Sequence, residues 1–231
     1  MDLIRDNSQR SKYVLVLLGI LAFFDLLSVG FNYYQNMVLE GYEFGEYTDE
    51  YIENLDYLSI VISLTYFSSF IITIVLFIQW FRRAYGNLIR LDVNMEYTEN
   101  GSVWGYFIPF INWVRPIKTM KEIYLKTQKV IKEYNSTLVF NKNTEFIVVW
   151  WVIYLINGFI ANFASKQMNR ATTIDEFISA NNVYIFSDLV DVVSIGFAIL
   201  VIQKVSKLEL ILRETDTSLS LINQIGVKAE V

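Results

Sequence analysis

The stretch Leu58–Phe81 reads LSIVISLTYFSSFIITIVLFIQWF and contains no charged residue. An α-helix rises about 1.5 Å per residue, so a stretch of this length can cross a hydrocarbon layer of about 30 Å. Three more apolar stretches have comparable lengths, at residues 13–31, 146–164 and 183–205. Water cannot surround so much apolar surface at an acceptable free energy, so we expect four transmembrane helices.

The rest of the chain is too short for a separate large soluble domain. It has 231 residues, of which 54% are hydrophobic, and this predicts one membrane domain over residues 1–231. The first apolar stretch follows a basic leader and also resembles a secretory signal. Its length and the presence of Asp25 within it favour a retained first helix.

Two residue types are absent, and their absence narrows the classes of function. The chain has no cysteine and no histidine. Disulfides, thiolate metal sites and thiol nucleophiles are therefore excluded, and so is the side chain best suited to proton transfer near neutral pH. We expect no metal, no cofactor and no enzymatic activity, although an enzyme built from carboxylates, Ser, Lys or Tyr is left open.

The charged residues are segregated along the chain. The loop between the first two apolar stretches contains seven acids and no Lys or Arg, whereas the central segment 82–145 contains ten basic residues. The loop between the third and fourth stretches contains only Lys166 and Arg170 as basic residues. An excess of Lys and Arg marks the cytoplasmic side of a membrane protein. We therefore predict a multi-pass protein of the cell membrane with both termini and the central segment in the cytoplasm.

Two capping patterns predict where helices begin. Thr48, followed by two acids, suits the start of the second membrane helix, which we expect to run to about Arg83. Thr173 and Glu176 form the capping box T-x-x-E and predict a short surface helix that ends near residues 181–182, before the fourth span.

The central segment contains a short apolar run, Val103–Val114, that cannot span a bilayer. We expect a turn at residues 100–101, and the run itself to be re-entrant, interfacial or buried within the bundle. Pro109 interrupts any helix through the run, and Pro116 suits the first turn of a new helix.

The new helix is expected to be amphipathic and basic. Between Ile117 and Tyr134, apolar residues recur near helical spacing, and five lysines occupy much of the remaining surface. Such a helix is typical of one that lies on an anionic inner leaflet, with its lysines near lipid headgroups. Recruitment of a cytoplasmic partner is the alternative, and no reading motif indicates nucleic acid.

The sequences QWFRRAYGNL at 79–88 and WGYFIPFINWVRPIKTMKEIY at 104–124 resemble a bacterial multi-pass membrane family of unknown function, numbered 4328 among such domains. The residues that carry the likeness are Trp80, Arg83, Ala84, Tyr85, Asn87, Leu88, Trp104, Phe107, Ile108, Pro109, Asn112 and Pro116. The resemblance implies an integral membrane protein with this element between its second and third spans. It implies no established activity, so no catalytic residue is carried over.

Two roles are open for this shared element. Its polar members Asn87, Asn112 and Arg115 can satisfy backbone groups that the nonhelical turn leaves unpaired. The alternative is a lipid-headgroup or ligand site. Both interpretations concern the same residues: Arg83, Tyr85, Asn87, Trp104, Pro109, Asn112, Arg115 and Pro116.

Three carboxylates fall inside predicted spans. Asp25 lies near the outer end of the first span, and Asp188 and Asp191 lie three residues apart on one face of the fourth. Ionisable residues at such depth usually face the bundle interior and mark ion or proton pathways. A proton or cation site is one hypothesis. The other is that these acids are bonded to Ser28, Asn157 or Tyr side chains and help the helices to pack.

Three classes of function follow in order of preference. The first is a non-enzymatic scaffold, assembly factor or regulatory subunit that binds membrane lipids and a membrane-protein partner. The second is a small proton- or cation-coupled transporter or channel component that uses the three aspartates. The weakest is a lipid-processing enzyme, because the sequence contains no nucleophile–base pair and no metal motif.

Overall fold

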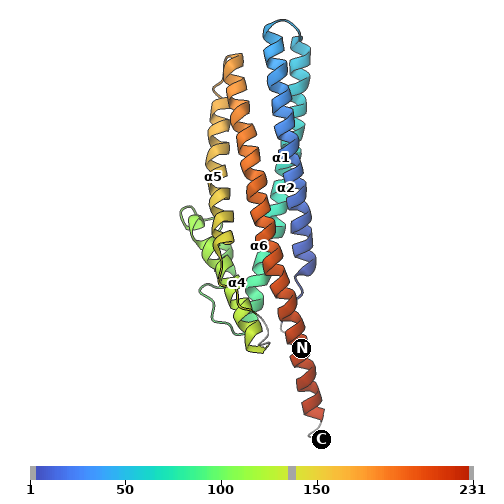
Figure 1. Cartoon of the computed structure of the whole chain (residues 1–231), viewed down its shortest axis with the longest axis vertical. Coiled ribbons are helices and arrows are strands. Elements are labelled where there is room, and N and C mark those ends of the chain that lie inside the picture. The colour runs from blue at the N-terminus through green and yellow to red at the C-terminus, as the bar shows by residue number, and fades with distance from the viewer. Residues whose placement is uncertain (1–3, 135–138, 229–231) are drawn as a thin grey trace. The chain divides into compact units, whose positions relative to one another are not determined.

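The computed structural model describes residues 4–134 and 139–228, with side chains up to residue 215. These residues form helices and no strand (Figure 1). The elements are α1 (Ser8–Glu43), α2 (Asp49–Arg90), α3 (Glu99–Trp104), the 3-10 helix η1 (Ile111–Trp113), α4 (Arg115–Tyr134), α5 (Glu145–Met168) and α6 (Ile174–Lys228). Helices α1, α2, α5 and α6 are long and apolar enough to cross a membrane. The expected all-α fold with four such helices is confirmed.

The chain divides into two compact units. Unit 1 comprises Met1–Leu15, Ile74–Val149 and Ile199–Val231, and unit 2 comprises Val16–Thr73 and Trp150–Ala198. The spans expected from the sequence lie within α1, α2, α5 and α6, and each of these helices contributes residues to both units.

Unit 2 consists of two helical hairpins, α1 with α2 and α5 with α6 (Figure 1). Polar side chains connect the hairpins: Asn36 of α1 accepts a hydrogen bond of 2.9 Å from Nδ2 of Asn181 in α6. Many large apolar side chains point outward and stay more than half exposed, including Phe23, Leu64 and Phe159. An outer surface of this kind suits hydrocarbon rather than water.

The ends of the helices in unit 2 follow the capping chemistry. Gly45 ends the turn after α1 with a positive φ of 79°, a conformation that glycine adopts without strain. The Thr48 hydroxyl accepts the backbone N–H of Tyr51 at 3.3 Å, which confirms Thr48 as the cap of α2. The capping box is also confirmed, because Glu176 N donates to Thr173 Oγ1 at 3.3 Å and Thr173 N donates to Glu176 Oε2 at 3.2 Å.

The helix that begins at this capping box does not end at residues 181–182, and this prediction was wrong. Helix α6 continues without a break to Lys228. Asn181 and Asn182 lie within it, and both side chains bond to Asn36 of α1 at 2.9–3.0 Å. The two asparagines therefore connect helices instead of terminating one.

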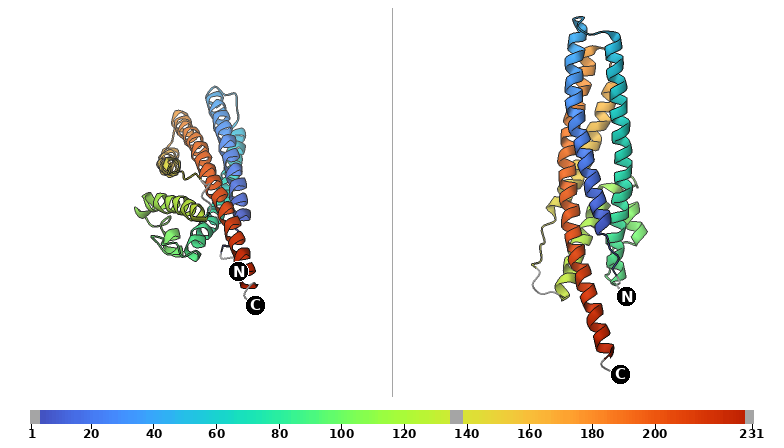
Figure 2. Two further views of the ribbon diagram at one scale, coloured as in Figure 1. Left: turned by 60° about the horizontal axis from the view of Figure 1, so that its bottom comes forward. Right: turned by 90° about the vertical axis from the view of Figure 1, so that its right-hand side faces the viewer.

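Unit 1 packs the end of α2 against α4 and parts of α5 and α6. Its core contains Phe81, Met120, Ile147 and Val205, all fully buried. Helices α3 and η1 both contact α4 (Figure 2). The ring of Tyr124 meets the ring of Phe146 edge to face, with centroids 5.3 Å apart. The apolar side of α4 is thus covered by protein.

The apolar face of α4 therefore packs against protein, and the placement of its lysines near lipid headgroups stays a prediction. Met120 and Ile123 are fully buried inside unit 1, whereas Lys118, Lys129 and Lys132 are exposed. The sequence pattern identifies an apolar face but does not distinguish a lipid cover from a protein cover.

The central segment turns earlier than expected. The predicted turn at residues 100–101 was wrong, since both lie in the first turn of α3, where Thr98 Oγ1 accepts the N–H of Gly101 at 3.1 Å. The chain turns instead at Asp92, whose φ is 55°. Helix α4 begins at Arg115, so Pro116 occupies its first turn as predicted.

The apolar run 103–114 is not buried within the bundle. It forms the end of α3, a set of turns around Pro109, and η1. Most of its large side chains are exposed, with Phe110 at 76% and Trp104 at 60%, whereas the ring of Tyr106 packs against Phe77 and Phe81. Of the three placements left open by the sequence, the structure therefore removes the buried one, and the interfacial and re-entrant placements stand.

Candidate functional site

The three aspartates singled out in the sequence all lie in unit 2. Asp25 comes from α1, and Asp188 and Asp191 come from α6. The charge of Asp25 interacts with the charges of both other aspartates, so the fold brings residues more than 160 positions apart into one cluster. We call Asp25, Asp188 and Asp191 the carboxylate cluster.

The partners of the carboxylate cluster are hydroxyl and amide groups. The Tyr66 hydroxyl of α2 donates to Asp191 Oδ2 at 3.0 Å. Ser28 bonds to Asp188, and Asn157 bonds to Asp191, so these two acids have the partners that the packing hypothesis named. Asn157 Oδ1 also accepts a hydrogen bond of 2.9 Å from Ser187, which connects α6 to α5. Asp25 is only 2% exposed, and its Oδ2 has no hydrogen-bond partner within the described residues.

No cation balances the carboxylate cluster from within its unit. The only basic residues of unit 2, all of which the structure describes, are Lys166 near the end of α5 and Arg170 in the loop beyond it. An ionised carboxylate in a low-dielectric site without a partner is costly. The cluster therefore favours a bound proton or a bound cation over three free charges.

Among the described residues, no group of three His, Cys, Asp or Glu is arranged to hold a metal ion. Proton binding does not need such a group, because each carboxyl group can bind a proton alone.

The family-like residues at the end of α2 form part of the core of unit 1. Trp80, Ala84, Tyr85 and Leu88 are buried there. The Tyr85 hydroxyl donates to Glu122 Oε2 of α4 at 2.8 Å. The same hydroxyl accepts the backbone N–H of Tyr97 at 3.0 Å. Burial, with the hydrogen bond to Glu122, raises the pKa of Tyr85, so this residue stays a neutral connector between helices.

Asn87 satisfies a backbone segment that the sequence did not indicate. Its Nδ2 donates to the carbonyl of Arg5 at 3.0 Å, and its Oδ1 accepts the N–H of Arg5 at 3.1 Å. One of the two roles left open by the sequence was that Asn87 bonds backbone groups around the nonhelical turn, and the structure places its backbone partners elsewhere. The unpaired backbone groups that it satisfies precede α1 instead.

Arg115 is the polar residue that does serve the central segment. Its guanidinium lies 4.5 Å from the centre of the Tyr97 ring and reaches the Gly101 carbonyl at 3.5 Å. A Cβ at Gly105 would lie 2.2 Å from Arg115 Cδ, so only glycine lets this side chain pass. Asn112 lies in η1, where its backbone N–H donates to the carbonyl of Ile108 at 2.9 Å.

The structure also adds two residues that the sequence analysis missed. Asn7 Nδ2 donates to the carbonyl of Trp80 at 3.0 Å and to both carboxylate oxygens of Glu209 at 3.0 and 3.1 Å. Glu209 lies beyond residue 205, where the fourth predicted span ends, and burial raises the pKa of its carboxyl to about 8. A signal was present, since Glu209 follows the buried Val205 by four residues and precedes the buried Leu212 by three.

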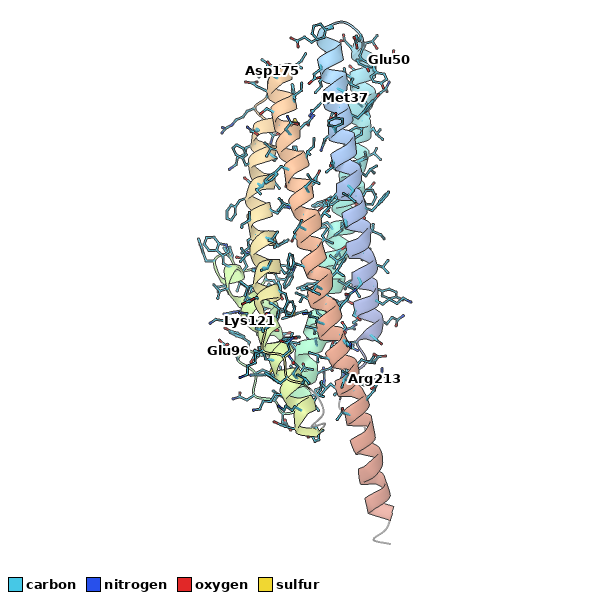
Figure 3. All side chains as sticks on the ribbon, viewed as in Figure 1. Met37, Glu50, Glu96, Lys121, Asp175 and Arg213 are labelled. Carbon is cyan, nitrogen blue, oxygen red and sulfur yellow. The ribbon has the colours of Figure 1, made fainter. Side chains whose placement is uncertain are left out.

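Like Asn7, Asp6 connects the residues before α1 to both α2 and α6. Arg83 Nη1 donates to the Asp6 carbonyl at 3.0 Å. Arg213 of α6, which is labelled in Figure 3, pairs with the Asp6 carboxylate at 2.9 Å. We call residues 4–8 the N-terminal strap, because bonds from both α2 and α6 hold it in unit 1.

Comparison with known proteins gives a family and no activity. Neither the curated proteins nor the solved structures contain a match to this chain. One family model matches residues 46–207, which is most of the chain and includes every family-like residue between Trp80 and Pro116. Its description is a domain of unknown function, and the chain belongs to that family, DUF4328.

Proposed function

We propose that the protein is a small multi-pass membrane protein that binds protons at the carboxylate cluster and couples their movement to transport across the membrane. The observation that supports this most strongly is Asp25, whose carboxyl group is buried in unit 2 and has an oxygen without a hydrogen-bond partner among the described residues. Two further carboxylates lie close enough to interact with it. This ranks the transporter above the scaffold that composition alone favours.

Two of the three acids are spaced along α6, where they could exchange a proton with each other. Asp191 accepts the Tyr66 hydroxyl, and Asp188 lies one turn nearer the outer loops in the expected topology. When a carboxyl group here loses its proton, a neighbouring hydroxyl can stabilise the carboxylate by donating a hydrogen bond to it. Alternatively, a neighbouring acid can transfer its own proton to that carboxylate. Three acids at two depths would thus permit stepwise transfer without a basic residue.

The orientation is part of the same proposal. Both termini and the central segment 82–145 lie in the cytoplasm, and the acidic loop after α1 lies outside, according to the distribution of Lys and Arg. The chain has no cysteine, so single cysteines can be introduced as Lys126→Cys or Glu46→Cys. An impermeant thiol reagent added to intact cells is expected to label only the Glu46→Cys variant, and labelling of Lys126→Cys alone would reverse the orientation.

The function is tested by proton flux. Full-length protein is reconstituted into liposomes that contain a pH-sensitive dye, and a potassium diffusion potential drives protons inward. We expect flux in the unaltered protein and its loss in Asp25→Asn and in Asp191→Asn. The matched control is Glu53→Gln, which removes an exposed acid from the same unit and is expected to keep the flux.

The outcomes separate proton from cation coupling. Equal flux in the three variants and in the unaltered protein, or no flux under any gradient of protons, Na⁺ or K⁺, contradicts the proposed function. Flux that requires Na⁺ or K⁺ and still depends on Asp25 transfers the assignment to a monovalent cation at the same site.

A group of exposed aromatic side chains supports a second candidate function, that of a scaffold or regulatory subunit. The side chains of Trp104, Phe107, Phe110 and Trp113 are exposed on one short segment that runs from the end of α3 to η1. Exposed aromatic groups of this kind mark a lipid or protein contact. A scaffold or regulatory subunit would bind a membrane-protein partner here. Purification in mild detergent tests this, because a stoichiometric partner that is lost in Phe110→Ser supports the scaffold.

A further inference from the structure

A second site, of opposite charge, lies in unit 1. A cavity of about 260 Å³ is lined by Arg5, Arg10, Gln79, Arg82, Arg83, Arg90 and Glu99. We call it the arginine cavity. Its lining comes from the N-terminal strap, the first turn of α1, the end of α2 and the start of α3. Residues far apart in the sequence are therefore brought together around one space.

The charges of the arginine cavity are not balanced by the protein. Glu99 is its only acid, and it pairs with Arg82 Nε at 2.8 Å and with Arg90 at 3.9 Å. Burial lowers the pKa of Arg83, and the nearby charges of Arg10, Arg5 and Arg90 lower it further, whereas the charge of Asp6, which pairs with Arg213, opposes this shift. Five guanidinium groups therefore line the cavity with one carboxylate, and a bound anion would relieve their mutual repulsion.

The guanidinium groups are held in place by neutral oxygens. Arg10 Nη1 donates to the Gln79 carbonyl at 3.1 Å, and Arg83 Nη1 donates to the Asp6 carbonyl at 3.0 Å. Arg90 Nη1 donates to Asn87 Oδ1 at 3.1 Å. Each guanidinium has five N–H donors, so these bonds fix its position and leave donors for a ligand. The planar fork of arginine matches the oxygens of a phosphate group.

Position and size indicate what kind of phosphate would bind. Arg82 directly follows the predicted span that ends at Phe81, and Arg10 precedes the span that begins at Tyr13. Both arginines therefore lie at the expected level of the lipid headgroups. The cavity has room for roughly nine water molecules at about 30 Å³ each, which suits a phosphate headgroup.

We propose that the arginine cavity binds a phosphate-bearing anion, either the headgroup of an anionic lipid or a free phosphate. The site would then hold the N-terminal strap, the start of α1 and the end of α2 around one ligand. This inference does not depend on the carboxylate cluster or on proton transport. Basic pockets at the cytoplasmic ends of membrane helices bind such headgroups in other proteins.

The test measures binding to purified full-length protein in a zwitterionic detergent. The probes are phosphatidylglycerol, phosphatidylcholine and inorganic pyrophosphate, each titrated while binding is followed by native mass spectrometry or calorimetry. The variant is Arg10→Gln with Arg82→Gln. The matched control is Lys118→Gln with Lys207→Gln, which removes the same charge from two exposed lysines of unit 1 that do not line the cavity.

We expect the arginine variant to weaken binding by roughly tenfold or more, because two charge-assisted contacts are lost, and the lysine variant to bind normally. The melting temperature without ligand shows whether the variant is folded, and Arg10→Lys with Arg82→Lys should recover part of the affinity. Phosphatidylglycerol binding that depends on the arginines assigns a lipid headgroup, and pyrophosphate binding alone assigns a free phosphate. Equal affinity of the arginine and lysine variants for every probe, or the absence of binding, overturns the proposal.

Discussion

Unit 1 and unit 2 treat their charged side chains in opposite ways. Unit 1 contains 17 basic and 12 acidic residues, whereas unit 2 contains 2 basic and 12 acidic residues. In unit 1, acids such as Glu122 and Asp6 accept hydrogen bonds or pair with a cation. In unit 2, Asp25 is buried beside two other acids. The comparison indicates that unit 1 uses polar groups to fix its structure, while unit 2 keeps an electrostatically costly cluster.

The largest expected effect concerns Glu209, the acid of unit 1 that is buried although the unit pairs acids such as Asp6 with cations. Its pKa is raised from an ordinary value near 4.5 to about 8, so the folded protein holds a proton that the unfolded chain releases between these pH values. Stability should therefore fall as the pH rises from about 4.5 to about 8 and then level off. Each unit of the shift is worth about 1.4 kcal/mol, so the total effect is several kcal/mol.

Melting curves in detergent from pH 5 to pH 9 measure this effect. Glu209→Gln should remove the decline and melt at a higher temperature than the unaltered protein at pH 8. Glu133→Gln, which changes an exposed acid of α4, should keep the decline. If the melting temperatures of Glu209→Gln and the unaltered protein changed with pH in parallel, Glu209 would not be a buried acid. Buried acids would then be a feature of unit 2, and the contrast between the units would be sharper.

The next effect tests whether polar groups in unit 1 are structural. Asn87→Leu leaves the N–H and the carbonyl of Arg5 without their partner. Each unsatisfied group costs about 1–3 kcal/mol, so we expect a loss of about 2–4 kcal/mol in the free energy of unfolding. Trypsin should also cut faster after Arg5 and Arg10. Asn100→Leu, at an exposed position of α3, is the control, and equal stability of the two variants would contradict a structural role for Asn87.

The N-terminal strap shows which structural features could be predicted from the sequence and which could not. Hydropathy predicted the four long helices because a bilayer requires about 20 apolar residues per span, and capping residues such as Thr48 act within one helical turn. The partner of Asn87 lies 82 positions away, and the partner of Asn7 in α6 lies 202 positions away. No local pattern encodes such pairs. The carboxylate cluster was different, because ionisable residues within apolar runs are visible in the sequence itself.

A third prediction tests the opposite claim for unit 2. Asp25→Asn keeps the shape of the side chain, removes its charge and supplies N–H donors to the neighbouring carboxylates. We expect it to raise the free energy of unfolding by about 1–3 kcal/mol, even though it is expected to abolish proton flux. Thermal unfolding in detergent measures the change, with Glu53→Gln as the matched acid in the same unit. Destabilisation by Asp25→Asn would instead indicate that the carboxylate is a packing residue.

The smallest effect compares two glycines, one in each unit. A Cβ at Gly105 would overlap Arg115 Cδ at 2.2 Å, whereas a Cβ at Gly158 of α5 meets no atom within 4 Å. Gly105→Ala should therefore displace Arg115 from the Tyr97 ring and cost about 1 kcal/mol, because a partly desolvated cation–π contact is lost. Gly158→Ala should stabilise α5 by up to about 1 kcal/mol, because alanine favours the helix. Thermal unfolding measures the change in the free energy of unfolding for both substitutions. A change of the same sign in both would mean that Gly105 is not needed for the packing of Arg115. The contrast between a closely packed unit 1 and a tolerant unit 2 would then weaken.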